Sequence, residues 1–486
     1  MNLNFVPIPS VHLPALSKAL RIFGIGYGIL LFIITALTLL LRRSLVAQLG
    51  GLTWKRNQFT RGWLITGDTG SGKTSSGINQ LAHQVFQHEK KWGGLCIDEK
   101  GVYWETLSAM ARHYEREDDL IHLQIRADGQ SELPLHRFNL TGDRTIPYST
   151  YAKFVVDTAT SLGQTGDKGF FKSQAQTHIA YALEFLATLG RPVTLAGALE
   201  VLSNKPKLNE DLEILGKMNV QSPRRRVLND HFKNRFLDQP AEQFGGVRET
   251  IGNYLQYFLT PEVAEIFCVR ESTFNFSAID KGKIILVTMP QKFQTERRYV
   301  NTFLKLLFYN HALRRFDQAK VQRGKNNLLI LWADEAQRFM TASEDGTSDY
   351  NCVDVIREAG ATIVAAAQST TSLIPPLGND KSKVLTLNLR NRMIFRSADE
   401  ADAVQAADFL GKKRVMKRSW GSSAGKRNVN YSENEEHKIK PYQLRSLRDH
   451  QCVLVHCEKG FRRVTLPPLE ADGKIAKWFS FWRRLI

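Results

Sequence analysis

Several kinds of site are absent from this sequence of 486 residues. Its five cysteines (Cys96, Cys268, Cys352, Cys452 and Cys457) form no CxxC pair, and no HExxH motif occurs. A zinc site of the common types needs such closely spaced ligands. An odd, scattered set of cysteines indicates reduced, intracellular thiols, which argues against a disulfide framework.

Acidic residues are too few to balance the basic ones, and the formal net charge is +18. Residues 401–486 carry 18 basic and 9 acidic side chains, which is half of the excess, whereas residues 142–275 carry 15 of each. A basic balance favours a polyanionic partner such as nucleic acid or an anionic membrane surface. A solvated basic face that keeps the protein soluble is the alternative.

Residues 22–41 contain no charged side chain, although Arg21 and Arg42–Arg43 bracket them. Twenty helical residues span roughly 30 Å, the thickness of a bilayer core. The segment is longer than the apolar part of a secretory signal, so it predicts an uncleaved, single-pass membrane anchor. More basic residues follow it than precede it, which places the N-terminus outside and the remaining chain in the cytoplasm.

Short apolar runs alternate with helical patterns, which predicts an α/β fold with a largely parallel sheet. Strands are expected at the start of "GWLITGDTGSGKTSSGINQLAHQVFQ", in 93–101, in 282–290 and in the run from Leu328 to the acids Asp334 and Glu335. Further strands are expected in 361–368, 391–398, 451–457 and 462–469. Between 142 and 275 apolar residues recur at helical spacing, as in Ala175, Ile179 and Ala182. We therefore expect an anchor (1–45), a nucleotide-binding domain in two parts (46–141 and 276–486) and an all-helical insertion (142–275). The basic stretch 412–427 is expected to be an exposed loop.

The stretch "GDTGSGKT" fits the P-loop pattern G-x-x-x-x-G-K-[ST], and it lies between an expected strand and an expected helix. The glycines allow the backbone N–H groups to surround phosphates at a helix N-terminus. Lys73 would reach the β- and γ-phosphates, and Thr74 would ligate Mg²⁺. The predicted nucleotide-binding residues are Gly67, Asp68, Thr69, Gly70, Ser71, Gly72, Lys73, Thr74 and Ser75.

Adjacent carboxylates end the apolar run "LLILWADEAQ". A P-loop enzyme needs an acid at the end of a neighbouring strand to hold the magnesium shell, and Asp334 suits this role. Glu335 would orient and deprotonate the attacking water, which is typical of ATP hydrolases of the RecA/AAA type. Gln368, which ends the run "ATIVAAAQ", would contact the γ-phosphate or the water. No LSGGQ-like signature lies between the P-loop and the acids, which argues against an ABC transporter.

The sequence resembles the coupling ATPases of type IV secretion and conjugation, the TraG/TraD-like proteins of the FtsK/HerA ring-ATPase group. The resemblance rests on the N-terminal anchor, "GDTGSGKT", "IDEKG", "RFNL", the helical insertion, "LLILWADEAQ", "REAGATIVAAAQS" and the late "NLRNRMIFRSADEADAVQAADFLG". It departs from the family in two ways, because one membrane helix is found where two are usual and Asn139 is followed by Leu140 rather than proline. The first departure puts in doubt how the protein docks on a secretion channel.

The resemblance implies a RecA-like core that binds ATP and Mg²⁺. It also implies a homo-oligomeric, hexameric ring at the bacterial inner membrane. It implies that the ring moves DNA, or a relaxase–DNA complex, toward the secretion channel. Arg357 occupies the place of an arginine that reaches into the neighbouring subunit's site; a salt bridge with Asp354 or Glu358 is the alternative. Asp98 and Lys100 are near-site candidates.

A DNA pump should grip phosphates without reading bases, and single-stranded DNA is the expected substrate. The candidate contacts are basic, with Trp420 available for stacking: Lys412, Lys413, Arg414, Lys417, Arg418, Arg224, Arg225 and Arg226. The apolar residues Ile475, Trp478, Phe479 and Trp482 share one face of an expected C-terminal helix. We expect that helix to dock on its own domain, the alternative being the membrane surface.

Two other functions fit the same sequence. One is a coupling ATPase for protein effectors, which needs no DNA. The other is a nucleotide-dependent scaffold that recruits substrates without pumping them.

Overall fold

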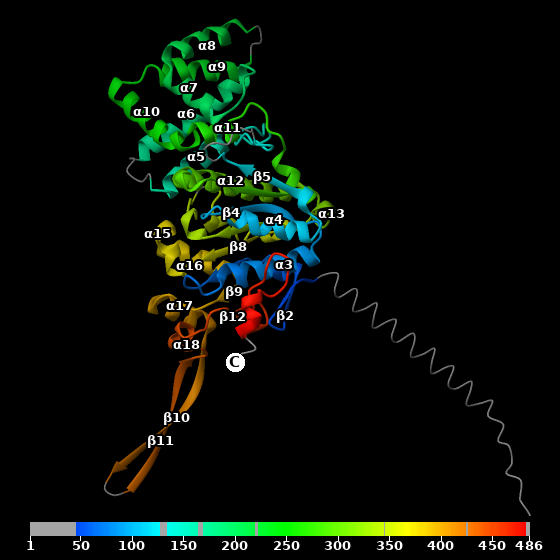
Figure 1. Cartoon of the computed structure of the whole chain (residues 1–486). Coiled ribbons are helices and arrows are strands. Elements are labelled where there is room, and N and C mark those ends of the chain that lie inside the picture. The colour runs from blue at the N-terminus through cyan, green and yellow to red at the C-terminus, as the bar shows by residue number, and fades with distance from the viewer. Residues whose placement is uncertain are drawn as a thin grey trace, which may run out of the picture.

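The protein is organised around one large, mostly parallel β-sheet (Figure 1). The computed structural model describes residues 45–126, 134–163, 169–218, 222–344, 346–423 and 426–482. The anchor predicted at 22–41 lies outside these residues. Among the residues that are described, no helix is both long enough and apolar enough to span a bilayer.

Within the described residues, the main sheet has nine strands in the order β13-β12-β9-β3-β8-β7-β4-β6-β5. The strands from β9 to β5 in this order run parallel. At the other edge, β12 and β13 are antiparallel. In chain order the strands are β3 (Trp63–Thr66), β4 (Gly93–Asp98), β5 (Leu120–Gln124), β6 (Ile284–Thr288), β7 (Leu329–Asp334), β8 (Ala361–Ala367), β9 (Asn391–Ile394), β12 (Gln451–His456) and β13 (Gly460–Thr465). The predicted parallel-rich α/β fold is confirmed.

Helices cover both faces of the sheet, which explains why the central strands are apolar at nearly every position. Strands β4, β7 and β8 are buried along their whole length. On one face α3 (Asn79–His88) and α4 (Tyr103–His113) pack on side chains such as Trp332 and Ile330. On the other face α12 (Gln294–Arg314) packs on side chains such as Leu331.

Helices α5 to α11 occupy the chain between β5 and β6, and the described residues of 142–275 contain no strand. They share one continuous hydrophobic core with α12 and the sheet, as the edge-to-face contact of Phe154 with Phe303 shows (ring centroids 5.7 Å apart). The helices are α5 (Tyr148–Ser161), α6 (Gly169–Thr188), α7 (Leu195–Ser203), α8 (Lys205–Lys217), α9 (Pro223–Asp230), α10 (Ala241–Leu255) and α11 (Pro261–Phe267). Figure 1 shows them stacked at the end of the molecule away from β12.

Shorter elements connect and flank the sheet. A small antiparallel pair, β1 (Leu45–Leu49) and β2 (Leu52–Lys55), precedes it. The remaining helices are α2 (Arg56–Phe59), α13 (Lys320–Arg323), α14 (Asp349–Cys352), α15 (Ile374–Leu377), α16 (Asn379–Asn388), α17 (Glu400–Leu410), α18 (Pro441–Arg445) and α19 (Lys477–Trp482).

The loop predicted at 412–427 is wrong. This stretch forms β10 (Lys412–Ser423), which pairs with β11 (Lys426–His437) in a long antiparallel hairpin that projects from the body (Figure 1). The cause is cross-strand charge pairing, because the basic residues of β10 face acids that come later in the sequence. Lys417 pairs with Glu436 at 2.7 Å, and Arg414 pairs with Glu433 at 3.5 Å.

Candidate active site

The P-loop connects β3 to a helix that begins at Lys73 with a wide π turn (Lys73–Ile78) and continues as α3. Gly67 and Gly72 have φ angles of 155° and 102°. A Cβ atom at Gly72 would lie 2.7 Å from the Nδ1 of His450, and one at Gly67 would lie 2.6 Å from the Cβ of Phe395. Both positions therefore need glycine for backbone conformation and for space.

Lys73 is 8% exposed and curls back over the loop. Its Nζ donates hydrogen bonds to the backbone oxygens of Gly67 (2.7 Å) and Asp68 (3.0 Å). Burial lowers the pKa of Lys73, although the charges of Glu335 and Asp334 oppose this shift. The ammonium group is thus held by carbonyl oxygens of the loop, within the influence of the two acids' charges.

Thr74 and Asp334 meet across the site, 260 residues apart in sequence. The Thr74 hydroxyl donates to Oδ2 of Asp334 at 3.2 Å. Burial raises the pKa of Asp334 to about 6, with further contributions from the charges of Asp98 and Glu335. The carboxyl group is therefore placed beside the P-loop in surroundings that disfavour its negative charge.

Glu335 has a left-handed backbone (φ 52°), which is uncommon for a residue other than glycine. Its carboxylate accepts hydrogen bonds from the amides of Gln337 (2.7 Å) and Gln368 (3.4 Å), and the Lys100 ammonium lies 3.7 Å away. Gln368 reaches it because β8 lies between β3 and β7, and the backbone N–H of Gly67 also donates to the Gln368 carbonyl (3.2 Å). The structure thus gathers Lys73, Thr74, Asp334, Glu335 and Gln368 at one edge of the sheet.

The neighbouring Asp98 has a structural task. Its carboxylate accepts hydrogen bonds from the backbone N–H groups of Lys100, Val102 and Tyr103, all at 2.8 Å, and so shapes the turn that leads into α4. In the register of the sheet Asp98 lies beside Asp334. Its charge therefore raises the pKa of Asp334, although its own oxygens are occupied by the three backbone N–H groups.

Sequence reasoning missed three residues that border the site. Gln337 contacts Glu335, Arg396 lies beside the loop with its guanidinium 3.8 Å from Asp68, and His450 packs against Gly72. Gln337 could have been suggested by its place two residues after Glu335. Nothing in the sequence brings Arg396 or His450 to the loop, because each comes from a distant strand end.

Arg357 lies far from this chain's own site. It is exposed in a short 3₁₀ turn (Ile356–Ala359) before β8. The seven residues of β8 span about 20 Å at roughly 3.3 Å each, and Gln368 is at the other end. Among the described residues, no ion pair of Arg357 with Asp354 or Glu358 is found.

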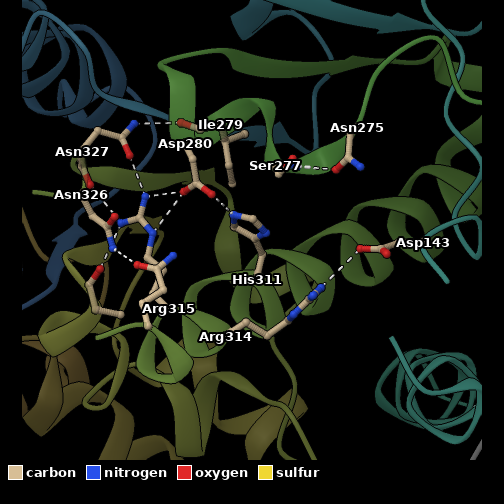
Figure 2. Close-up of polar contacts among 12 residues, drawn as sticks. Asp143, Asn275, Ser277, Ile279, Asp280, His311, Arg314, Arg315, Asn326 and Asn327 are labelled. Carbon is tan, nitrogen blue, oxygen red and sulfur yellow. Dashed lines mark hydrogen bonds and ion pairs between the residues drawn. The ribbon is translucent and has the colours of Figure 1, made fainter. Parts of the chain in front are cut away.

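A buried polar network holds this turn in place (Figure 2). The Arg315 guanidinium donates to the backbone oxygens of Ala359 (3.0 Å) and Asn327 (2.9 Å) and to the carboxylate of Asp280. His311 contacts the second oxygen of Asp280 at 2.8 Å. Because Arg315 is 2% exposed and grips the residue that closes the 3₁₀ turn, the backbone that carries Arg357 is fixed to the body.

The candidate DNA contacts fall into two places. One is the hairpin β10–β11 and the other is α9. Nearby acids offset the charge of some of these residues: Lys412 lies 3.9 Å from Asp408, and Arg224 on α9 pairs with Glu184. Arg418 lies over the Trp420 ring (4.1 Å), and Trp420 is 64% exposed. Lys413 and Arg226 are exposed, and Arg225 donates to the carbonyl of Met218 (3.4 Å).

The sequence matches a family described as the type IV secretion-system coupling protein DNA-binding domain, over residues 180–467. The chain belongs to this family. The match begins after the P-loop and includes Asp334, Glu335 and Gln368. The resemblance found in the sequence is therefore confirmed. No curated protein gives a significant match.

Solved structures of coupling proteins have the same fold. The bacterial conjugative coupling protein TrwBdeltaN70, in its unbound monoclinic form, gives a TM-score of 0.62 at 15% identity, covering 88% of this chain and 90% of that one. The plasmid coupling protein TrwB in complex with ADP and Mg²⁺ gives 0.62 at 16% identity, covering 87% and 89%. TrwB with a non-hydrolysable ATP analogue gives the same values. At these identities the likeness establishes the RecA-like fold of the family.

Proposed function

We propose that this chain is the subunit of a ring ATPase that couples ATP hydrolysis to the movement of DNA, or of a relaxase–DNA complex, toward a type IV secretion channel. The observation that carries the proposal is the Thr74–Asp334 hydrogen bond. It joins the P-loop, which follows β3, to the acid pair at the end of β7, with one strand (β8) between them, and phosphoryl transfer needs this arrangement. Family membership adds the secretion context.

Two features fit a bound ATP and Mg²⁺. Among the described residues, the buried Lys73 ammonium finds its hydrogen-bond acceptors in the backbone oxygens of Gly67 and Asp68, and phosphate oxygens would replace them. The raised pKa of Asp334 means that a nearby cation would stabilise its ionised form. Thr74 and Asp334 would hold Mg²⁺, which would neutralise charge on the phosphates.

Hydrolysis itself is assigned to Glu335 as the general base. Glu335 is 9% exposed, and the amides of Gln337 and Gln368 both donate to its Oε2, which orients the carboxylate. Gln368, at the exposed end of β8, is suited to contact the water or the γ-phosphate. Its hydrogen bond to Glu335 couples the two residues.

Arg357 is assigned to the site of the neighbouring subunit. Its exposure, and its place before the end of β8 opposite to Gln368, argue against action in cis and agree with a ring in which each site is completed by the next copy. We therefore propose a homo-oligomer, with six copies as the family resemblance implies. The hydrogen bond from Arg315 to Ala359 would hold the turn that carries Arg357 in a constant place at the interface between neighbouring subunits.

DNA contact is assigned first to the basic residues of the hairpin β10–β11, and Arg224, Arg225 and Arg226 of α9 are secondary candidates. Arg418, with the exposed rings of Trp420 and Tyr431 beside it, is the best-placed group for single-stranded DNA, because aromatic rings stack on any base. Lys417, Arg414 and Arg224 form ion pairs with acidic side chains, so we expect a smaller contribution to DNA binding from them.

Attachment to the inner membrane remains a proposal from the sequence, which predicts a single anchor at 22–41 with the ATPase in the cytoplasm. The neutral charge of residues 142–275 suits contacts with a cargo protein such as a relaxase better than contacts with DNA. Docking on channel proteins follows from family membership alone.

The test is ATP hydrolysis by the purified full-length chain with and without single-stranded DNA. We expect DNA to stimulate turnover, and Glu335→Gln to lower kcat about 100-fold or more while MgATP still binds. Glu213→Gln, the same change at an exposed position of α8, should leave turnover unaltered. Lack of stimulation by any DNA would exclude the DNA pump; stimulation by a cargo protein instead would favour the effector-coupling function, and nucleotide binding without turnover would favour the scaffold.

A further inference from the structure

The C-terminal segment of the chain lies directly against the P-loop and the start of its helix. The backbone N–H of His450 donates to the Ser71 carbonyl (2.9 Å), and that of Leu469 donates to the Ser75 carbonyl (3.2 Å). The Gln80 amide on α3 donates to the Pro467 carbonyl (2.7 Å). Figure 1 shows this segment, in red, beside α3 and the ends of β9 and β12. The P-loop and its helix are therefore hydrogen-bonded to His450, Pro467 and Leu469, which follow them by almost 400 positions. We call these three residues the C-terminal clamp.

His450 is the centre of this clamp. Its Nδ1 hydrogen-bonds to the Ser76 hydroxyl at 2.8 Å, and its ring fills the space that a side chain at Gly72 would need. Its backbone is left-handed (φ 63°), a strained state that persists only when the surroundings enforce it. Burial lowers the pKa of His450, so the ring is uncharged at neutral pH and can pack against other rings.

Two aromatic side chains of α19 pack on the outer side of His450. The ring centroids of Trp478 and Phe479 lie 5.3 Å and 5.4 Å from that of His450. Nevertheless Trp478 is 54% exposed. A tryptophan held this close to a P-loop, with half of its surface open to solvent, offers a ring face to a ligand of the loop.

The order of the strands determines which part of a nucleotide would lie there. Glu335 and Gln368 come from β7 and β8, on one side of β3, and they define the γ-phosphate end. The α-phosphate, the sugar and the base must then extend toward the other side of β3, where β9 ends and β12 begins. His450 precedes β12, and the segment that carries Trp478 follows β13, so both lie on that side.

We propose that Trp478 is the stacking platform for the base of the bound nucleotide, held against the P-loop by His450. This inference rests on the proposed ATPase function and names the base-binding part of the same site. Stacking requires only an aromatic face, so the platform recognises a nucleoside triphosphate as a class and favours the larger purines over pyrimidines.

The test compares a ligand that has a base with one that lacks it. In the full-length chain, Trp478→Ala should raise the Kd for MgADP about 5- to 30-fold, as expected for loss of one stacking contact. The Kd for inorganic tripolyphosphate should change less than twofold, because only the P-loop binds it. Calorimetry measures both, and steady-state kinetics should show a raised KM for ATP with kcat within about twofold.

Two further variants make the result specific. Trp478→Phe keeps a ring and should recover most of the MgADP affinity. Tyr442→Ala removes another exposed aromatic side chain (62% exposed), on α18, and should alter neither Kd. An unchanged MgADP Kd in Trp478→Ala, or an equal loss for both ligands, would overturn the proposal. Failure of the unaltered chain to bind either ligand would instead overturn the proposed ATPase function.

Discussion

Asp334 should destabilise the protein in the absence of Mg²⁺, and Asp334→Asn should relieve this cost. Burial and the neighbouring acids raise the pKa of Asp334 to about 6 from an ordinary value of 3.8. A shift of about 2 units corresponds to roughly 3 kcal/mol between the two protonation states. Asparagine has nearly the same shape and can still accept a hydrogen bond from Thr74, so the variant removes the charge and little else.

The sign of the pH dependence follows from the raised pKa. A carboxyl group whose folded pKa lies above its unfolded pKa favours folding at low pH, and this advantage is lost as pH rises through about 6. Linkage then predicts that Asp334→Asn exceeds the original chain in unfolding free energy by about 3 kcal/mol at pH 8 and by about half as much at pH 5, before loss of hydrogen bonding is counted.

Urea titrations of both chains at pH 5 and pH 8, without nucleotide or metal, measure this difference. Asp354→Asn, an exposed position, provides the matched control and should show no such pH-dependent gain. MgADP at about 100 times its Kd should add roughly 2.7 kcal/mol to the original chain and much less to the Asp334 variant. If Asp334→Asn proves less stable than the original chain at pH 8, the argument from buried charge is refuted and hydrogen bonding dominates.

Three further predictions concern the loop, the ring and the hairpin. Gly72→Ala should abolish nucleotide binding, measured by calorimetry, because an added Cβ meets His450 and φ is 102°; binding within a few-fold of normal would contradict the packing described. Mixtures of Arg357→Ala and Lys73→Ala subunits should regain ATP hydrolysis at some interfaces, although each variant alone is inactive; if no mixture is active, Arg357 does not act in trans. Trp420→Ala should weaken binding of single-stranded DNA about 5-fold or more in fluorescence anisotropy without changing basal ATP hydrolysis, and unchanged affinity would remove the hairpin from the DNA path.

Parts of the structure with a strong local pattern were predictable. The strands β3, β7 and β8 are unbroken apolar runs that end in chemically distinctive residues, and the P-loop pattern fixes a strand, a turn and a helix together. Strand β5, "LIHLQ", was missed because an edge strand alternates buried and half-exposed positions and carries polar residues. The hairpin was missed because Lys412–Ser423 has low strand propensity, and its acids lie beyond the turn.

The sequence by itself determined the candidate groups of the proposed site: a loop with the P-loop pattern, two acids and an amide, each at the end of a recognisable strand. Local patterns suffice for this, because a loop motif and a buried strand are properties of adjacent residues. Tertiary structure alone decided which groups meet. It placed Gln368 on Glu335, separated Arg357 from its own site by the length of β8, and brought His450 and Trp478 to the P-loop. These contacts depend on strand order and on packing between residues hundreds of positions apart, which no local pattern records.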